Sequence, residues 1–379
     1  MLTSFEIKNF RTFSHLRIER LGRVNLIVGK NNVGKTTLLE ALHVYTAENP
    51  RVVHENLADR DELLFSGVPG EAHLDYGSLF HGRQPAGHEI ILGPAQGTGA
   101  EGRLTIELVE MEREEDSDGN VDYHEITDSD VEPEGEIVDG LGIRLDGGPG
   151  RLYQPHRPRW KYLIEPDVAY IRTEDVPSGL LGRWWDSIAG TDYEREAIDS
   201  LSIVAPFKLV RLVNDPTRQA GRVFRVRMEG ATDLVPLKSL GGGPFRLFEI
   251  ATAVAYLARM SASHQKSAQK APSDIPEEAL GRRVKTLLID EIENGIHHTL
   301  HAKLWRLILR LAQEYNLQVF ATSHSWDCIE GFQKALEADG EADGLLIRLE
   351  TKEDIDKSRA VIFDRDELPI VTRESIEVR

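Results

Sequence analysis

Eight residues near the start of the chain have the types and spacing needed to hold phosphate groups. The segment 29–36, GKNNVGKT, fits the pattern G-x-x-x-x-G-K-[ST] without exception. In such a loop the glycines let backbone N–H groups point at phosphates, the lysine reaches the outer phosphates, and the threonine hydroxyl binds Mg²⁺. The residues predicted to contact nucleotide and metal here are Gly29, Asn31, Asn32, Gly34, Lys35, Thr36 and Thr37.

Two later segments carry side chains that could complete the chemistry of such a loop. TLLIDEIE is an apolar run that ends in Asp290, which is suited to holding Mg²⁺, and Glu291, which is suited to polarising a water molecule. VFATSHS is a second apolar run, and His324 at its end could bond the terminal phosphate and sense its loss. The long separation between Lys35 and Asp290 argues against small kinases and GTPases.

A second glycine-rich stretch, SLGGG, precedes an amphipathic segment. A helix that starts on glycines can bind an anion through its free N–H groups, as the first loop does. The residues predicted to do so are Ser239, Gly241, Gly242 and Gly243. Because one nucleotide does not need two such helix starts from one subunit, we expect two protomers that each complete the other's site.

The elements that must position these side chains follow a regular order. RVNLIVG (23–29) predicts a buried strand, and a helix should run from Lys35 to about Tyr45. The strand that ends at Asp290 is followed by an amphipathic helix to about Tyr315 and directly by the next apolar strand. Strand, helix and strand in this order predict an α/β fold with a parallel sheet.

The positions of the motifs divide the chain into two parts. Residues 1–45 and 235–379 should form one core that is split in sequence, with a β-rich and helical lobe, 46–234, inserted between them. Within that lobe the acidic segment 110–139 is interpreted as a solvated loop or hairpin tip. The polar, proline-containing segment 261–283 is interpreted as an exposed linker.

Composition excludes several classes of protein. The chain has 379 residues, 40% of them hydrophobic, which is normal for a packed globular protein. Its formal net charge of −18 argues against coating nucleic acid by bulk electrostatics, although a local basic face remains open. A single cysteine, Cys328, excludes an intrachain disulfide. The absence of a signal peptide or long apolar run leads us to expect a cytoplasmic protein without a membrane segment.

Together, these motifs in this order resemble the ABC-type ATPase heads of the SMC and RecF class. FEIKNFRTF, SLGGG and LLIDEIENGIHHTLHAKLW most resemble the ATPase portion of the OLD (overcoming lysogenization defect) family. The resemblance implies an ABC-type head with a mixed, largely parallel core sheet and an antiparallel β lobe, ATP and Mg²⁺ as ligands, and ATP hydrolysis. It implies that Lys35 and Thr36 bind phosphate and Mg²⁺, Asp290 and Glu291 are the metal and catalytic carboxylates, and His324 is the switch histidine. Residues 293–297 would be the D-loop at a dimer seam, and Arg11 would lie near the nucleotide.

The chain also departs from these families. Transporter-like signatures read L-S-G-G-Q, but Leu240 is followed here by Gly241, so only Ser239 could replace the missing serine. Gly242 stands where OLD proteins commonly carry an acid. Gln84 and Gln96 are both candidates for a Q-loop glutamine.

OLD proteins also carry a C-terminal Toprim nuclease domain. Asp364 and Asp366 imitate its D-x-D motif, but the chain ends soon afterwards, so we interpret FDRDEL as a solvated strand end. We therefore expect an ATPase that forms a homodimer or higher oligomer around nucleotide and controls a separately encoded Toprim-like nuclease in bacterial anti-phage defence. The alternatives are a RecF-like repair ATPase that binds DNA directly, and a scaffold that binds ATP without hydrolysing it.

Three further patterns have simpler explanations than the chemistry they imitate. TKED (351–354) imitates a guanine-reading motif but lies beyond the ATPase core. His297 and His301 have the spacing of zinc ligands, yet no third ligand accompanies them in register. Trp184 and Trp185 are assigned to the core rather than to an exposed contact patch.

Overall fold

The computed structural model describes most of the chain, and its residues fall into the following ranges: 1–47, 50–65, 72–95, 102–115, 121–126, 136–145, 151–153, 167–204, 207–214, 222–268, 285–352 and 357–373. All structural statements below concern these residues. None of the described helices is both long and apolar enough to cross a bilayer.

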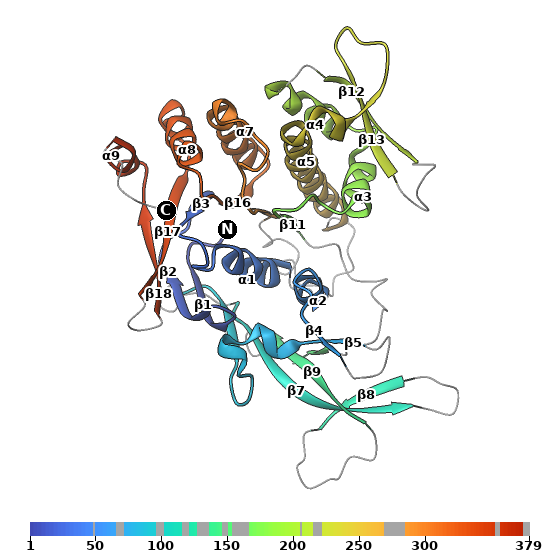
Figure 1. Ribbon diagram of the computed structural model, residues 1–379, viewed down its shortest axis with the longest axis vertical. Helices are drawn as coiled ribbons and strands as arrows, with labels where there is room; N and C mark the ends of the chain where they lie inside the picture. Colours follow the sequence, from blue (N-terminus) through green and yellow to red (C-terminus); the bar gives the residue numbers. More distant parts are fainter. Residues whose placement is uncertain are drawn as a thin grey trace.

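A six-stranded sheet forms the centre of the molecule (Figure 1). Its strands, in spatial order, are β11 (Val168–Ile171), β15 (Lys285–Ile289), β16 (Leu317–Thr322), β3 (Val24–Val28), β17 (Gly344–Lys352) and β18 (Lys357–Phe363). The first five are parallel, and β18 pairs with β17 in the antiparallel sense. The strands β11, β15, β16 and β3 are buried along their whole length, which explains why they read as continuous apolar runs.

Helices and a second sheet cover the two faces of this central sheet. On one face lie α5 (Gly242–Ala268), α7 (His301–Glu314) and α8 (Trp326–Ala338), and on the other lies α1 (Lys35–Ala47), as Figure 1 shows. Alternate side chains of one strand enter different cores. Leu26 of β3 packs with the first group of helices, whereas Ile27 packs with α1 and the second sheet.

The second sheet is antiparallel and lies beside α1. Its strands are β1 (Phe5–Phe10), β2 (Phe13–Ile18), β6 (Ile90–Gly93), β7 (Leu104–Glu115), β8 (Val121–Glu125), β9 (Glu136–Leu145) and β10 (Arg151–Tyr153). The described parts of the acidic segment 110–139 therefore belong to β7, β8 and the start of β9. The overall class, a mixed α/β protein with a parallel core sheet and an antiparallel lobe, agrees with the class predicted from the sequence.

A third, small sheet packs against the signature helix α5. It contains β12 (Phe207–Asn214), β13 (Arg222–Met228) and β14 (Val235–Pro236) and is accompanied by α3 (Ser178–Ile188) and α4 (Asp192–Ser200). Trp184 stacks on Tyr256 of α5, and Trp185 packs against Phe224 and Phe248. Both tryptophans are buried, which confirms their assignment to the core.

The remaining elements are short. The helices are α2 (Pro50–Ala58) and α9 (Leu368–Arg373), and a two-stranded sheet joins β4 (Leu63–Phe65) to β5 (Ala72–Leu74). Short 3-10 helices cover Tyr76–Leu79, His81–Arg83, Leu201–Ile203, Leu237–Leu240 and His298–Leu300.

Two expected boundaries differ from the structure. The segment 46–234 does not form one inserted lobe, because β6 to β10 extend the sheet of β1 and β2, whereas β11 joins the edge of the central sheet. The expected linker 261–283 begins too early, since α5 continues to Ala268, and residues 269–284 lie outside the described part of the chain. Both differences arise from long-range pairing and packing that a local pattern does not record.

Candidate nucleotide site

The P loop connects β3 to α1, and its glycines occupy positions where a side chain does not fit. Gly29 has a φ of +148°, and a Cβ there would lie 2.6 Å from the carbonyl oxygen of Leu349. Gly34 has a φ of +96°, and a Cβ there would lie 2.5 Å from the ring of Phe13. Asn31 and Asn32 are exposed. The loop is therefore shaped by close contacts with β2 and β17, in addition to the conformational freedom of glycine.

Lys35 begins α1 and folds back over the loop. Its ammonium donates hydrogen bonds to the carbonyl oxygens of Gly29 (2.7 Å) and Lys30 (3.0 Å). Burial lowers the pKa of Lys35, while the carboxylates of Asp290 and Glu291 act in the opposite direction. These contacts hold the ammonium at the mouth of the loop, where phosphate oxygens could replace the two carbonyl oxygens as acceptors.

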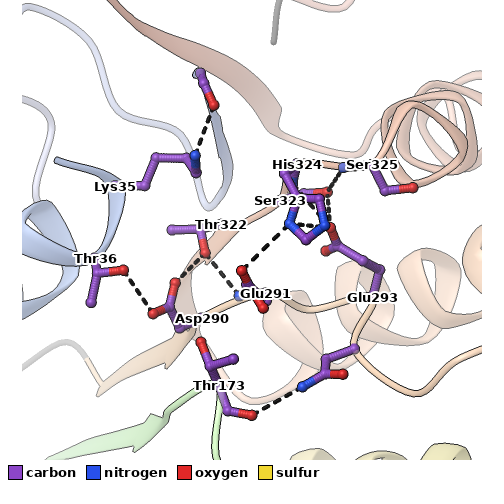
Figure 2. A network of polar contacts seen from close by, with 12 residues as sticks. Lys35, Thr36, Thr173, Asp290, Glu291, Glu293, Thr322, Ser323, His324 and Ser325 are labelled. Atoms are coloured by element: carbon purple, nitrogen blue, oxygen red, sulfur yellow. Dashed lines mark hydrogen bonds and ion pairs between the residues drawn. The ribbon is translucent and has the colours of Figure 1, made fainter. Parts of the chain in front are cut away.

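Asp290, at the end of β15, connects this strand to α1 and to β16 (Figure 2). One carboxylate oxygen accepts from the hydroxyl of Thr36 at 2.9 Å, and the other accepts from the hydroxyl of Thr322 at 2.5 Å. Asp290 is buried, with only 5% of its surface exposed. A carboxylate and a hydroxyl within bonding distance form a hard oxygen donor set of the kind that Mg²⁺ prefers. Thr37, in contrast, is buried within α1.

Glu291 and His324 face one another at the ends of β15 and β16. Glu291 has a φ of +47°, and its N–H donates to the Thr322 hydroxyl at 2.8 Å. The Nδ1 atom of His324 lies 3.5 Å from a carboxylate oxygen of Glu291. The structure therefore brings the predicted base and the predicted switch histidine together (Figure 2).

Glu293 is a third carboxylate at this position, and it was expected only as part of a D-loop. One of its oxygens accepts hydrogen bonds from the Ser323 hydroxyl and the His324 N–H, both at 2.9 Å, and lies 3.4 Å from His324 Nδ1. Its side chain is mostly buried, and among the described residues its other oxygen has no hydrogen-bond partner. The third acid of DEIE, two residues after Glu291, was the available signal for this second partner of the histidine.

The glycine-rich start of α5 has a different environment from the P loop. Ser239 is exposed, and its hydroxyl donates to the carbonyl oxygen of Pro236 in its own chain at 2.6 Å. A Cβ on Gly243 would lie 2.7 Å from the carbonyl oxygen of Gly295, so this start packs directly on the D-loop segment. Within the described ranges, no hydrogen bond or ion pair joins residues 239–243 to the P loop.

The first turns of α5 are nevertheless connected to the site through two charged residues that the sequence analysis missed. The guanidinium of Arg246 donates to the carbonyl oxygens of Asp290 and Arg172, the latter at 2.6 Å. Glu249 is fully buried, lies 3.4 Å from Arg246 and accepts from the N–H of Val176 at 2.6 Å. Burial raises the pKa of Glu249 to about 7. An Arg and a Glu in an otherwise apolar helix were the signal that could have identified this pair.

Arg11 does not extend into the P loop. Its guanidinium forms ion pairs with Glu40 of α1 at 3.0 Å and with Glu62 at 2.7 Å, and the side chain is largely buried. Its charge is therefore balanced within the chain, and its predicted contact with nucleotide stays a prediction.

Among the described residues, no glutamine lies in the segment beside the acidic pair. Gln84 ends a short 3-10 helix in the region of the antiparallel sheet, and Gln96 lies outside the described residues. The residues that follow β11 occupy the place next to β15 instead, where the carbonyl oxygen of Thr173 accepts from Asn294 at 3.0 Å. This segment could not be assigned from the sequence because no glutamine marks it.

Three other patterns are now located. His301 is buried with Nε2 3.1 Å from the Ile296 carbonyl oxygen, whereas His297 is exposed and caps the next turn, so the two rings have separate partners. Asp364 accepts from the N–H groups of Asp366 and Glu367 in the turn after β18. Residues 353 and 354 of TKED lie outside the described part.

Two family models match the chain at its two motif regions. Residues 1–68 match a model described as an AAA ATPase domain, and residues 206–327 match one described as an AAA domain, putative AbiEii toxin, type IV TA system. The first contains the P loop, and the second contains the signature, the acidic pair and His324. These matches support an ATPase of the AAA type.

Individual relatives agree with this assignment. An ATP/GTP phosphatase from Helicobacter pylori is 20% identical over 363 residues, which cover 87% of each chain. An uncharacterized protein from Methanocaldococcus jannaschii is 47% identical over 74 residues, and the DNA replication and repair protein RecF of Bacillus mycoides is 42% identical over 78 residues. These two matches cover only 34% and 18% of the relatives' own lengths.

Among solved structures, two SMC head domains align with 96% of the ATPase. One is an SmcHead bound to the C-winged helix domain of ScpA (13% identity, TM-score 0.46, 98% of that chain covered), and the other is the SMC head domain from Thermotoga maritima (15%, 0.40, 99%). At these low scores the fold description rests on the strand order and the P loop.

Proposed function

We propose that this protein binds ATP with Mg²⁺ at the P loop and hydrolyses it. The observation that carries the proposal is Asp290, whose two oxygens bond the hydroxyls of Thr36 and Thr322 at 2.9 and 2.5 Å. A carboxylate held in this way joins the phosphate loop to the strand that ends in the acidic pair. It also lies next to Glu291, the candidate base, in the sequence.

Each side chain has a role that follows from its position. Lys35 exchanges its two carbonyl acceptors for phosphate oxygens, and Thr36 and Asp290 would hold Mg²⁺. When bound, Mg²⁺ supplies positive charge that offsets the negative charge on the phosphates. Glu291 accepts a proton from the attacking water, and His324, between Glu291 and Glu293, contacts the terminal phosphate and registers its loss.

The proposal includes a nucleotide-dependent homodimer or higher oligomer. Ser239, Gly241 and Gly242 are exposed at the start of α5 and contact the P loop of their own chain through no hydrogen bond or ion pair among the described residues. A helix start with free N–H groups attracts anions, so it is suited to the phosphates held by a second copy. The D-loop residue Gly295 packs against it and would lie at the same seam.

The proposed output is control of a separate effector, a Toprim-like nuclease, in bacterial anti-phage defence. This part rests on the resemblance to OLD proteins, and the family description that mentions a putative AbiEii toxin is compatible with a defence role. Co-purification of the ATPase with the product of an adjacent Toprim-like gene tests it, and a neighbourhood of repair genes without such a partner would contradict it.

Glu291→Gln tests the hydrolytic function. We expect phosphate release to fall by roughly 10²- to 10⁴-fold, because the variant retains the shape of the site but loses the base. ATP should then raise the mass of the variant by stabilising the dimer, as measured by light scattering. Glu337→Gln, an exposed substitution on α8, is the matched control and should leave both readouts unchanged.

The same experiment separates the alternatives. Equal phosphate release above the buffer background by Glu291→Gln and the parent protein would contradict the assignment of Glu291 as the base. No release above background by the parent protein, with ATP still bound, would favour a scaffold that does not hydrolyse ATP. Parallel assays with GTP are informative, because the Helicobacter relative is described as acting on both nucleotides.

A RecF-like role, in which the ATPase contacts DNA itself, is the second candidate. RecF proteins from several bacteria match the chain, including one that is 34% identical over 76 residues in Lactobacillus johnsonii. This role predicts that ATP changes DNA affinity, which the Glu291→Gln protein can test because it retains nucleotide.

A further inference from the structure

The small sheet beside α5 carries a concentration of positive charge that the ATPase site does not use. The described residues of β12 and β13 include five basic side chains and no acidic one, in a chain whose net charge is −18. They are Lys208, Arg211, Arg222, Arg225 and Arg227.

Three of these arginines share the outward face of the sheet. The opposite face is fixed by packing, since Phe224 and Val226 are buried, and Phe224 lies 4.7 Å from Phe248 of α5 between ring centroids. Because side chains alternate along a strand, Arg225 and Arg227 must point to solvent, and both are exposed. Arg211 of β12 is directly opposite Arg225 in the register and is also exposed. We call Arg211, Arg225 and Arg227 the arginine face.

Little within the described part of the chain balances this charge. Lys208 pairs with Glu229 and Arg222 with Asp186, but these two lie outside the arginine face. Arg225 reaches only the carbonyl oxygen of Leu234, at 3.4 Å, and in the described part of the chain Arg211 and Arg227 have no hydrogen-bond or ion-pair partner. Like charges directly opposite one another on two strands destabilise a sheet. The arrangement is therefore a cost to folding that a bound anion would relieve.

We propose that the arginine face binds the phosphate backbone of a nucleic acid duplex. Arginine forms forked, charge-assisted hydrogen bonds with phosphate oxygens, and the arginine face presents three such side chains on one exposed surface. The rest of the outward face is aliphatic, with Leu209 and Val213 on β12 and Val223 on β13. Contacts with phosphate oxygens carry no information about the bases, so this contact is independent of sequence.

The position of the face separates it from the acidic part of the molecule. Figure 1 shows β12 and β13 at the opposite end from the hairpin of β7 and β8, which carries much of the negative charge. A duplex that lies on the arginine face thus avoids the acidic hairpin. The net charge of the whole chain, which argues against bulk coating of nucleic acid, does not argue against this local contact.

The test uses the full chain and a fluorescently labelled 30-bp duplex, with anisotropy measured over a range of salt concentrations. The triple variant Arg211→Gln, Arg225→Gln, Arg227→Gln should bind at least tenfold more weakly at low salt. Its slope of log affinity against log salt should be shallower by about 2.7, or about 0.9 for each phosphate that an arginine no longer neutralises. Because the variant removes like-charge pairing, its melting temperature should be equal or higher, so weaker binding would not reflect unfolding.

A charge-matched control is available on α7, where Lys303, Arg306 and Arg310 are exposed. Their replacement by Gln changes the net charge equally and should leave the salt slope as in the parent. Equal effects of the two triple variants, or no salt-dependent binding by the parent at about 100 µM protein, a concentration that covers typical non-specific affinities, would overturn the proposal. So would self-association of the parent, without nucleic acid, that disappears in the arginine-face variant, because the occupant would then be a second copy.

The last measurement compares the DNA duplex with an RNA duplex of the same sequence. Tighter binding of one of the two identifies which nucleic acid the arginine face prefers. The measurement needs no ATP turnover. A negative result therefore leaves the proposed hydrolysis intact, and failure of hydrolysis leaves this inference intact.

Discussion

The two helix starts at 29–36 and 239–243 are both rich in glycine, but their surroundings differ. The P loop is enclosed by its own protomer, since Cβ atoms on Gly29 and Gly34 would collide with Leu349 and Phe13, and Thr36 is bonded to Asp290. The start of α5 is open on the side of Gly241, where a Cβ would meet no heavy atom within 4 Å among the described residues. The difference teaches that Gly29 and Gly34 combine close packing with a positive φ, whereas Gly241 serves backbone conformation alone.

The two lysines beside these starts give the largest predicted difference. Lys35→Ala should weaken ATP binding by roughly 100-fold or more, because the variant cannot form charge-assisted bonds to phosphate oxygens. Lys238→Ala should change it by less than about twofold, because Lys238 is exposed and is paired with Asp175. Isothermal titration of both variants with ATP measures the contrast. Similar weakening in both would contradict the contrast and show that Lys238 also contributes to nucleotide binding.

The start of α5 is joined to the nucleotide site through Arg246 and Glu249, and the contribution of Glu249 to stability should depend on pH. Burial raises the pKa of Glu249 to about 7, so the folded protein binds this proton more tightly than the unfolded chain does. The contribution of protonated Glu249 to the free energy of unfolding is therefore complete below about pH 4.5 and is lost as the pH rises to about 7. From the size of the shift it amounts to roughly 3 kcal/mol.

Glu249→Gln should remove this contribution, which urea unfolding of the parent and the variant at pH 5, 6, 7 and 8 would measure. The difference in unfolding free energy between the two proteins should change over pH 5–7 and stay constant above that range. Glu337→Gln on α8 serves again as control. A difference that is independent of pH would contradict a raised pKa for Glu249.

Alanine at one glycine of each start separates close packing from backbone conformation. Gly34→Ala should destabilise the protein by about 3 kcal/mol, because φ is positive and the new Cβ meets the ring of Phe13. Gly241 has a φ of +101° but no such neighbour, so Gly241→Ala should cost only about 1 kcal/mol. Chemical unfolding of both proteins without nucleotide gives the comparison, and equal losses of stability would refute the difference in enclosure.

Sequence could predict those features in which a functional residue directly follows a recognisable strand. The loop at 29–36 and the acids at 290 and 291 follow short apolar strands, so residue type and spacing were enough to predict that they meet at one sheet edge. The role of Arg11 was not predictable in this way, because its partners Glu40 and Glu62 come from elements distant in sequence.

Other features depend on burial, which the one-dimensional pattern records only weakly. β11 joins the central sheet through the burial of four residues, too few to show a period. Glu249 is buried within a helix that is apolar on most sides, so nothing local indicated that its carboxylate would bond the N–H of Val176.

The smallest predicted effect concerns Ser239, and it decides whether the open start acts on a second copy. In the free chain its hydroxyl donates to Pro236 three residues earlier, a bond that could be exchanged for a phosphate oxygen of another protomer. In the Glu291→Gln background, Ser239→Ala should leave ATP binding by the monomer within about twofold and weaken the ATP-dependent dimer by about fivefold, the value of one modest hydrogen bond. Ser187→Ala is the matched control, because the hydroxyl of Ser187 likewise donates to a carbonyl three residues earlier, at 2.7 Å. Sedimentation at several protein concentrations measures the dimer. An unchanged dimer in Ser239→Ala would mean that the exposed hydroxyl has no partner across the seam, and that backbone N–H groups alone make the contact.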